Sequence, residues 1–216
     1  EQYRAAGYDA DALVNFLALL GWNPGTEQER FTRDGLAEAF DFDGVSKSGA
    51  KFDLDKLQWF NGQVLRDMPV EDLAEAARLS AEEAGLAFDD ATLHAAAALM
   101  QERVTFPHEI AEARYFFEDP TDYDEKGVKK RWKADAADLV AAYADRLETL
   151  DTFDAETAER ELRSITAARE IGAGRLIHPT RLAISGVTFG PGLFDLMVAI
   201  GREGCVRRMK RAVEVL

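Results

Sequence analysis

The residues best suited to bind a ligand lie together in residues 177–194. Gly190, Pro191 and Gly192 form a turn sequence, because glycine reaches positive φ at little cost and proline fixes its own φ and has no N–H. Such a turn can present bare backbone amides to a ligand. Arg181 lies on the preceding segment and adds a cation. The combination predicts a site for an anion or for the acceptor atoms of a base.

A helix begins directly after this turn. Leu193, Leu196, Met197 and Ile200 recur at helical spacing. The unpaired N–H groups and the macrodipole at a helix N-terminus favour anions and acceptor atoms, which strengthens the prediction of a site. A structural alternative stays open, in which the turn is only a tight helix-helix connection whose glycines permit close packing.

The rest of the chain has the sequence pattern of helices, so we predict an all-α protein. Apolar residues recur at helical spacing, Asp, Thr or Pro stands at most starts, and alternating strand patterns are nearly absent. On the helix from Asp9 we expect Leu13, Leu17 and Leu20 to share the buried face, and we expect Trp59 to pack in the core rather than stack on a ligand. The other expected helices cover residues 32–40, 53–61, 69–84, 89–102, 107–117, 126–150, 154–171 and 202–216.

Composition limits the class of protein. With 216 residues, 47% of them hydrophobic and 31% charged, the chain can form one globular domain or two small ones. No apolar run approaches the roughly 18 residues that cross a bilayer, so we expect a cytoplasmic protein without a membrane partner. Cys205 is the single cysteine and cannot form an internal disulfide. The chain begins at Glu1 inside an amphipathic pattern, so we expect it to be part of a longer protein.

The charge distribution matters more than the total. A net charge of −14 argues against a nucleic-acid partner. However, cations outnumber acids eight to three in residues 169–211, and a second basic cluster in residues 126–133 follows the acidic run 119–125. Charge runs of this kind are usually solvated helix faces, so these clusters alone are weak support for a polyanion partner.

No set of side chains has the spacing of a catalytic or metal site. His94, His108 and His178 are far apart in the sequence and lack metal-ligand spacing. The abundant Asp and Glu residues stand mostly where helix caps and solvated faces require them. We therefore expect no catalytic residue and no metal ligand in this chain.

Three segments together resemble the C-terminal half of bacterial glutamyl-tRNA synthetases, which are class I enzymes. They are residues 1–22, residues 42–61, and residues 179–186 together with 190–194. Their order and separations also match, so the resemblance covers essentially the whole chain. Within the second segment, residues 46–48 look like the end of the family's Lys-Met-Ser-Lys-Ser loop, but the first lysine of that motif is absent.

The resemblance implies an all-α fold in which a helical stem-contact domain is followed by an all-helical anticodon-binding cage. Residues 1–66 would form the stem-contact domain and the start of the anticodon-binding region. Residues 67–150 and 151–216 would form two helical subdomains of the anticodon-binding cage. The family's enzyme joins glutamate to glutamate tRNA through a glutamyl-adenylate, using ATP and magnesium, and is expected to be a monomer. Its catalytic motifs would lie upstream of Glu1, so this chain would bind no cofactor and would not aminoacylate by itself.

The family's functional positions map onto several parts of the chain. Arg103 falls where the family places an arginine that reads the last anticodon base. Arg181 and residues 190–193 fall where the unstacked anticodon loop is held. These residues, with Phe189, also supply the guanidinium, apolar and aromatic groups that bind splayed bases. Contacts to the tRNA stem would come from two lysines that could equally be solvated loop charges, Lys47 and Lys51.

Two alternatives remain at this stage. In the first, the chain is a helical protein-interaction module whose acidic N-terminal three-quarters binds a basic protein. In the second, the parent enzyme also charges glutamine tRNA, because base preference depends on where the Arg103 guanidinium points. If the chain is the tRNA-binding half of the family's enzyme, the acidic middle of the chain, residues 67–125, is expected on the outer face, because it is less basic than a tRNA groove should be.

Overall fold

The computed structural model describes residues 2–46 and 49–216, and the regular elements in these ranges are helices without a strand. The expected all-α class is therefore confirmed. The only extended pairing in the described ranges is an isolated bridge between Trp22 and Val45. The elements, in order, are α1 (Gln2–Ala5), α2 (Ala10–Gly21), α3 (Arg33–Ala39), α4 (Leu54–Asp67), α5 (Val70–Glu83), α6 (Asp90–Met100), α7 (Glu109–Glu112), the 3-10 helix η1 (Arg114–Phe116), α8 (Glu125–Arg131), α9 (Ala136–Glu148), α10 (Ala155–Ala168), α11 (Gly174–Ser185), α12 (Leu193–Ile200) and α13 (Arg202–Val215).

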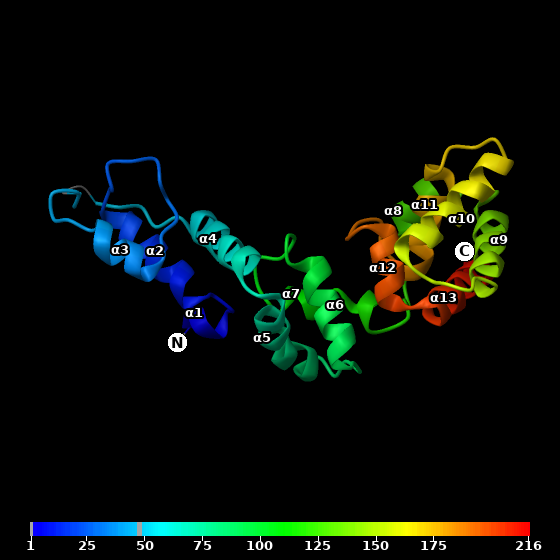
Figure 1. Cartoon of the computed structure of the whole chain (residues 1–216), viewed down its shortest axis with the longest axis horizontal. Helices are drawn as coiled ribbons and strands as arrows, with labels where there is room; N and C mark the ends of the chain where they lie inside the picture. Colours follow the sequence, from blue (N-terminus) through cyan, green and yellow to red (C-terminus); the bar gives the residue numbers. More distant parts are fainter. Residues whose placement is uncertain (1, 47–48) are drawn as a thin grey trace.

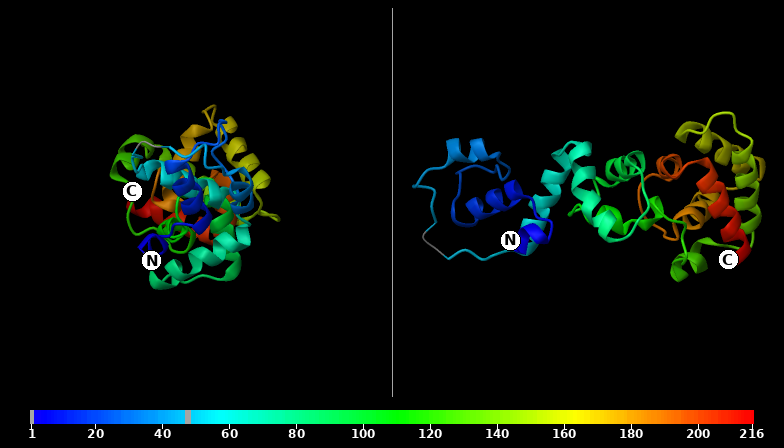
Figure 2. Two further views of the ribbon diagram at one scale, coloured as in Figure 1. Left: turned by 90° about the vertical axis from the view of Figure 1, so that its left-hand side faces the viewer. Right: turned by 90° about the horizontal axis from the view of Figure 1, so that it is seen from below.

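The molecule is elongated. Figure 1 shows α1–α4 at one end, α5–α7 in the middle and α8–α13 at the other end. The view from below shows the same progression, and the end-on view shows a cross-section much smaller than the length (Figure 2). Within the described ranges, no helix has both the length and the apolar character needed to cross a lipid bilayer.

Two buried clusters stabilise this shape. Ala12 and Phe16 of α2 pack against Leu57 and Phe60 of α4 near the N-terminus. A larger core runs through α5–α13, where α9 lies against α13 and α10, and α6 lies against α12. The boundary expected at residue 150 stays a prediction.

Side-chain caps fix where the helices begin, as expected. A side-chain oxygen that accepts an N–H of the first turn stabilises a helix start by about 1 kcal/mol. Thr32, Asp53 and Asp154, which stand at the starts of expected helices, all make this bond, and so does Asp9 at the start of α2. Asp89 caps α6 in the same way through the N–H of Thr92, at 2.7 Å.

Two expectations about burial are wrong. Leu17 is 49% exposed, because α2 turns Ala12, Asn15 and Phe16 toward the protein instead. Asn15 is buried at that face since its amide bonds the backbone of the segment before α3. Trp59 is 44% exposed and meets the ring of Phe60 edge-on at 5.0 Å, so it lies at the rim of the core.

Three expected segments also differ in their helical structure. Residues 107–117 form two short helices, α7 and η1, and the helix expected over residues 126–150 is interrupted after Arg131. Residues 177–185, expected as a turn-rich segment, belong to α11. Pro179 lies inside that helix, where it removes one N–H but its fixed φ suits helical geometry.

Candidate nucleic-acid interface

The expected turn connects α11 to α12 and is tied to Arg181. Nη2 of Arg181 donates a hydrogen bond of 2.6 Å to the carbonyl oxygen of Pro191. Gly192 is the N-cap of α12, and Leu193 begins that helix with only 5% of its surface exposed. The turn is therefore held from both sides, by a guanidinium and by a buried leucine. Leu193 packs into the core and does not present its side chain to solvent.

Glycine is required at residue 190. Its φ of +132° lies in the region that L side chains rarely adopt. A Cβ at this position would lie 3.2 Å from the hydroxyl oxygen of Tyr115 and 3.4 Å from Nη1 of Arg181. Gly190 thus lets the backbone approach both a phenol and a guanidinium.

A second glycine fixes the exit from α11. Gly186 ends this helix in the left-handed conformation, with φ of +75°. A Cβ there would lie 2.6 Å from the carbonyl oxygen of Asp122, and the N–H of Asp124 donates to the Gly186 carbonyl at 2.8 Å. This contact anchors the start of the loop that carries Phe189.

Arg103 joins the same site from the middle part of the molecule. It lies in the turn after α6, where its N–H donates to the carbonyl of Met100 at 2.7 Å. Its side chain is exposed and forms no hydrogen bond or ion pair within the described ranges. The charge of Arg103 acts on Arg181 and on Tyr115, so the two arginines lie near each other although they are distant in the sequence.

The pKa shifts at the site reflect this proximity. Burial raises the pKa of Tyr115, and the positive charges of Arg181 and Arg103 oppose that rise. Burial also lowers the pKa of Arg181; Tyr115 opposes this shift and Arg103 adds to it. Both guanidiniums stay protonated, since arginine keeps its charge in proteins. Two like charges therefore share one partly buried site.

The sequence did not reveal Tyr115 as a member of the site. It stands in η1 beside Phe116 and Phe117, and such an aromatic run reads as core. Its position depends on Arg208, which is buried and donates from Nη1 to the carbonyls of Tyr115 at 2.6 Å and Ile184 at 2.9 Å. One cation of α13 thus holds both η1 and the end of α11.

The unpaired groups at this site are hydrogen-bond donors, so they can bind acceptor atoms of a ligand. Nη1 of Arg181 is buried and has no hydrogen-bond partner within the described ranges. Leaving a buried donor unpaired costs free energy. A ligand acceptor that bonds this N–H therefore adds the full free energy of the new hydrogen bond to binding. Phe189 is 72% exposed next to the turn and offers an aromatic face. Phosphate oxygens and base edges fit the guanidiniums, and a base fits the ring.

A pocket of about 510 Å³ opens beside Tyr115 and Phe189, and it has the opposite charge. Glu109, Glu112 and Glu118 contribute to its lining. Carboxylates repel phosphates, so this side of the site is unfavourable for an RNA backbone.

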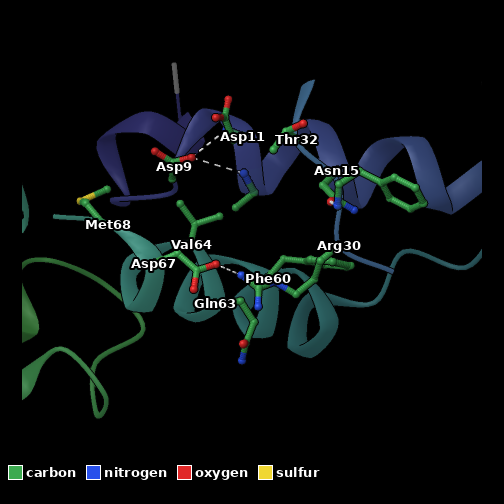
Figure 3. Close-up of a pocket in the computed structure, with 12 residues that line it drawn as sticks. Asp9, Asp11, Asn15, Arg30, Thr32, Phe60, Gln63, Val64, Asp67 and Met68 are labelled. Atoms are coloured by element: carbon green, nitrogen blue, oxygen red, sulfur yellow. Dashed lines mark hydrogen bonds and ion pairs between the residues drawn. The ribbon is translucent and has the colours of Figure 1, made fainter. Parts of the chain in front are cut away.

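The pocket in Figure 3 lies near the N-terminal end of the molecule, between α2 and α4. Several of its polar side chains already bond to other parts of the protein. Asp9 caps α2, and Arg30 forms an ion pair with Asp67. Asn15 uses its side chain on the backbone of residues 29 and 31. Within the described ranges, no group of three or more His, Cys, Asp or Glu residues has the arrangement of a metal site.

The predicted stem contacts are remote from this site. Lys51 is exposed in the loop before α4, and that loop lies at the opposite end of the molecule from α11 and α12 (Figure 1). Lys47 lies outside the described residues. Contact of these lysines with a tRNA stem stays a prediction.

The described part of the chain is an all-helical protein in which hydrogen-bond donors of Arg181 lie beside a glycine-rich turn. A family model described as the anticodon binding domain matches residues 68–213, and the chain belongs to this family. Residues 1–59 match the model for the catalytic domain of class I tRNA synthetases (E and Q), and the stem-contact role expected for residues 1–66 stays a prediction.

Similar proteins of known name are glutamate-tRNA ligases. Those of Chloroherpeton thalassium and Porphyromonas gingivalis W83 are 43% and 44% identical over 100% and 99% of this chain, and the matches cover 46% and 43% of the relatives. The crystal structure of a glutamate tRNA ligase from Elizabethkingia meningosepticum, in complex with its amino acid, matches 99% of the chain and 43% of its own with a TM-score of 0.93 and 33% identity.

The chain therefore spans less than half the length of these relatives. The resemblance stated from the sequence is confirmed, and the comparisons do not favour the protein-docking alternative.

Proposed function

We propose that this chain is the tRNA-recognition part of a glutamate-tRNA ligase. The complete enzyme attaches glutamate to glutamate tRNA through a glutamyl-adenylate, using ATP and magnesium, and acts as a cytoplasmic monomer. The present chain binds the tRNA and does not aminoacylate by itself. Membership of the anticodon-binding family and the names of the relatives support this proposal.

One observation carries the proposal: Arg181 is bonded to the turn of residues 190–192, the charge of Arg103 acts on it, and neither arginine has a carboxylate partner in the described ranges. A single-stranded loop is bound when its bases unstack and their edges meet fixed donors. Arg181, pinned by Pro191, supplies such donors, and the exposed Phe189 supplies a stacking face. The anticodon loop of a tRNA has this chemistry.

Arg103 is the proposed reader of the last anticodon base. Its guanidinium is exposed and has no partner in the described ranges, so it can turn toward a base edge. The anticodons of glutamate and glutamine tRNA differ in that letter. A bidentate contact that fits one base and not the other would separate the two tRNAs by about 1–3 kcal/mol.

The test is a titration of this chain with transcripts of both tRNAs at two salt concentrations. It is repeated with Arg181→Ala and with a control, Arg78→Ala. Arg78 also carries a guanidinium, but it pairs with Glu75 and Asp90 far from the turn. We expect salt-sensitive binding that prefers glutamate tRNA, weakens with Arg181→Ala and is unchanged in the control. Absence of binding to either tRNA at low salt would count against the proposal.

A further inference from the structure

A second basic site lies between α8 and α11, which pack against each other. It is a pocket of about 420 Å³ at the start of α11. The pocket is lined by Lys130, Arg131, Lys133, Gly172, Gly174, Arg175 and His178.

The pocket gathers several cations that have no carboxylate partner. Exposed cations elsewhere are mixed in this respect, since Arg114, Arg163 and Lys210 form ion pairs with carboxylates, whereas Arg103 and Arg211 form none in the described ranges. In the pocket, only Arg175 forms such an ion pair, with Asp135 at 2.5 Å. The side chains of Lys130, Arg131 and Lys133 have no carboxylate partner in the described ranges, and the ammonium of Lys133 reaches only the carbonyl of Lys129.

This arrangement favours an external anion. The chain has a net charge of −14, so it contains enough carboxylates to pair with every cation. In the described ranges, however, no carboxylate pairs with Lys130, Arg131 or Lys133. Like charges that share a pocket repel each other, and a bound anion relieves that repulsion. The geometry therefore selects a ligand with concentrated negative charge and several acceptor oxygens, as a phosphate has.

His178 lines the pocket and stands before Arg181 on α11. Arg181, Arg103, Tyr115 and the turn of residues 190–192 are together called the arginine site. Burial lowers the pKa of His178, and the charges of Arg131, Arg181 and Lys130 lower it further. At neutral pH the ring is therefore uncharged and keeps one N–H donor. Since Arg181 stands about one helical turn after His178 on α11, the positive field of the pocket continues to Arg181 without an intervening carboxylate on that helix face.

We propose that this pocket binds a backbone phosphate of the same RNA whose loop is held at Arg181. This inference rests on the proposed function and adds a second contact to it. Arg175 and Arg181 are separated by about two turns of α11, roughly 9 Å of helix rise. A strand laid along α11 can thus place a base at Arg181 and a nearby phosphate in the pocket.

The test compares two double variants that remove the same charge. Lys130→Gln/Lys133→Gln removes two lysines without carboxylate partners, whereas Lys56→Gln/Lys210→Gln removes two lysines that pair with Glu29 and Glu148. The probe is a fluorescent anticodon stem-loop hairpin of glutamate tRNA, titrated at several salt concentrations. Thermal melting shows that each variant is folded.

We expect the pocket variant to bind more weakly than the control and to lower the slope of log K against log salt by about one per lost phosphate contact. The loss should be equal for hairpins that differ only in the last anticodon base, because phosphates carry no sequence information. A methylphosphonate at the contacted position should remove the difference between wild type and pocket variant.

The outcomes separate this inference from the proposed function. If the wild-type chain binds no hairpin, both fail. If it binds, Arg181→Ala weakens binding, and the pocket variant matches the control, only the phosphate site is overturned. A loss that depends on the last anticodon base would also overturn it, since the pocket would then read sequence.

Discussion

One nitrogen of the Arg181 guanidinium donates a hydrogen bond, and another is buried without a partner among the described residues. Nη2 bonds Pro191, whereas Nη1 is buried without a partner in the described ranges. Leaving a buried donor unpaired costs about 1–3 kcal/mol in the free protein. In the proposed complex, an RNA acceptor bonded to Nη1 would remove this cost, so the proposal implies a site that is more stable with ligand than without it.

This implication can be tested with Arg181→Met. The variant loses one hydrogen bond but also removes an unpaired buried donor, so the free energy of unfolding should change by less than about 1 kcal/mol. The affinity for the anticodon hairpin should fall at least about tenfold, since one charged contact is lost. Urea unfolding and the hairpin titration give the two numbers. A large loss of stability would mean that Arg181 is a structural residue.

Arg103→Ala tests base reading. We expect a loss of about 1–3 kcal/mol in discrimination between glutamate and glutamine tRNA, with a smaller change in the affinity for glutamine tRNA. The measurement is the ratio of the two dissociation constants at one salt concentration. Equal losses for both tRNAs would show a contact to the backbone instead, and Arg103 would not read the base.

Gly190→Ala tests the geometry of the turn. A Cβ there has an unfavourable φ and approaches Tyr115 and Arg181, so we expect a loss of about 1–2 kcal/mol of stability together with weaker RNA binding. Gly21→Ala is the control, because a Cβ at that position meets no atom within 4 Å and its φ is not positive. The measurement is the free energy of unfolding of both variants at one temperature. If Gly190→Ala is as stable as Gly21→Ala, the turn tolerates a side chain at residue 190.

At the scale of residues, the sequence predicted the cations and the turn better than their surroundings. Arg181 and the turn stand out through composition, and the resemblance adds Arg103. Tyr115 could not be found, because nothing local distinguishes an aromatic ring that faces a site from one in a core. The burial of Leu193 was likewise invisible, since it depends on how α12 packs.

Among the elements, α13 holds the two halves of the arginine site in register. Arg208 is buried on α13 and bonds the carbonyls of Tyr115 in η1 and Ile184 in α11. Asp119 completes the contact by accepting from Arg208 at 2.7 Å and from Arg207 at 2.7 Å. A buried guanidinium is stable only when its charge and donors are satisfied, so Asp119 is needed for this cluster.

The stability of this cluster should depend on acid. Hydrogen bonds from Arg207, opposed by burial and reinforced by Arg208, lower the pKa of Asp119 from 3.8 to about 2. Because the folded-state pKa lies below the unfolded value, the contribution is present above the unfolded pKa and is lost as the pH falls toward 2. Allowing for solvent screening, it amounts to on the order of 1–2 kcal/mol.

Urea unfolding at pH 5 and pH 2.5 tests this, with Asp119→Asn as the comparison. Between these two values, wild type should lose about 1–2 kcal/mol more than the variant, whose amide does not titrate in this range. Asp135→Asn is a control, because its partner Arg175 is exposed and the pair should contribute little. If wild type and Asp119→Asn lose the same amount, the cluster does not stabilise the fold.

Helix starts were easier to predict than helix breaks. Asp53 and Thr32 act within one turn, so their caps can be read from neighbouring residues. The break after Arg131 contains neither glycine nor proline, and it appears only because α8 packs on α11 while α9 packs on α13. In α11 the opposite holds, since packing keeps Pro179 inside a helix that local rules would end.

On the scale of the whole molecule, the arginine site joins two parts of an elongated body. Arg103 and Tyr115 come from the middle part, and Arg181 and the turn come from the C-terminal part (Figure 1). Contacts of α6 with α12 and of η1 with α11 fix their relative position. The sequence predicted the helices of both parts, but not that a site would form where they meet.

Hydrogen exchange with and without the anticodon hairpin of glutamate tRNA tests the central claim most directly, because it locates the bound RNA on the chain. We expect slower exchange in residues 100–117 and 186–194 on binding, with little change in α2–α4. Arg181→Ala should abolish that protection at the same hairpin concentration. Protection confined to α2–α4 or to α5, with no change at the turn, would contradict the assignment of the RNA site to Arg103, Arg181 and residues 190–192.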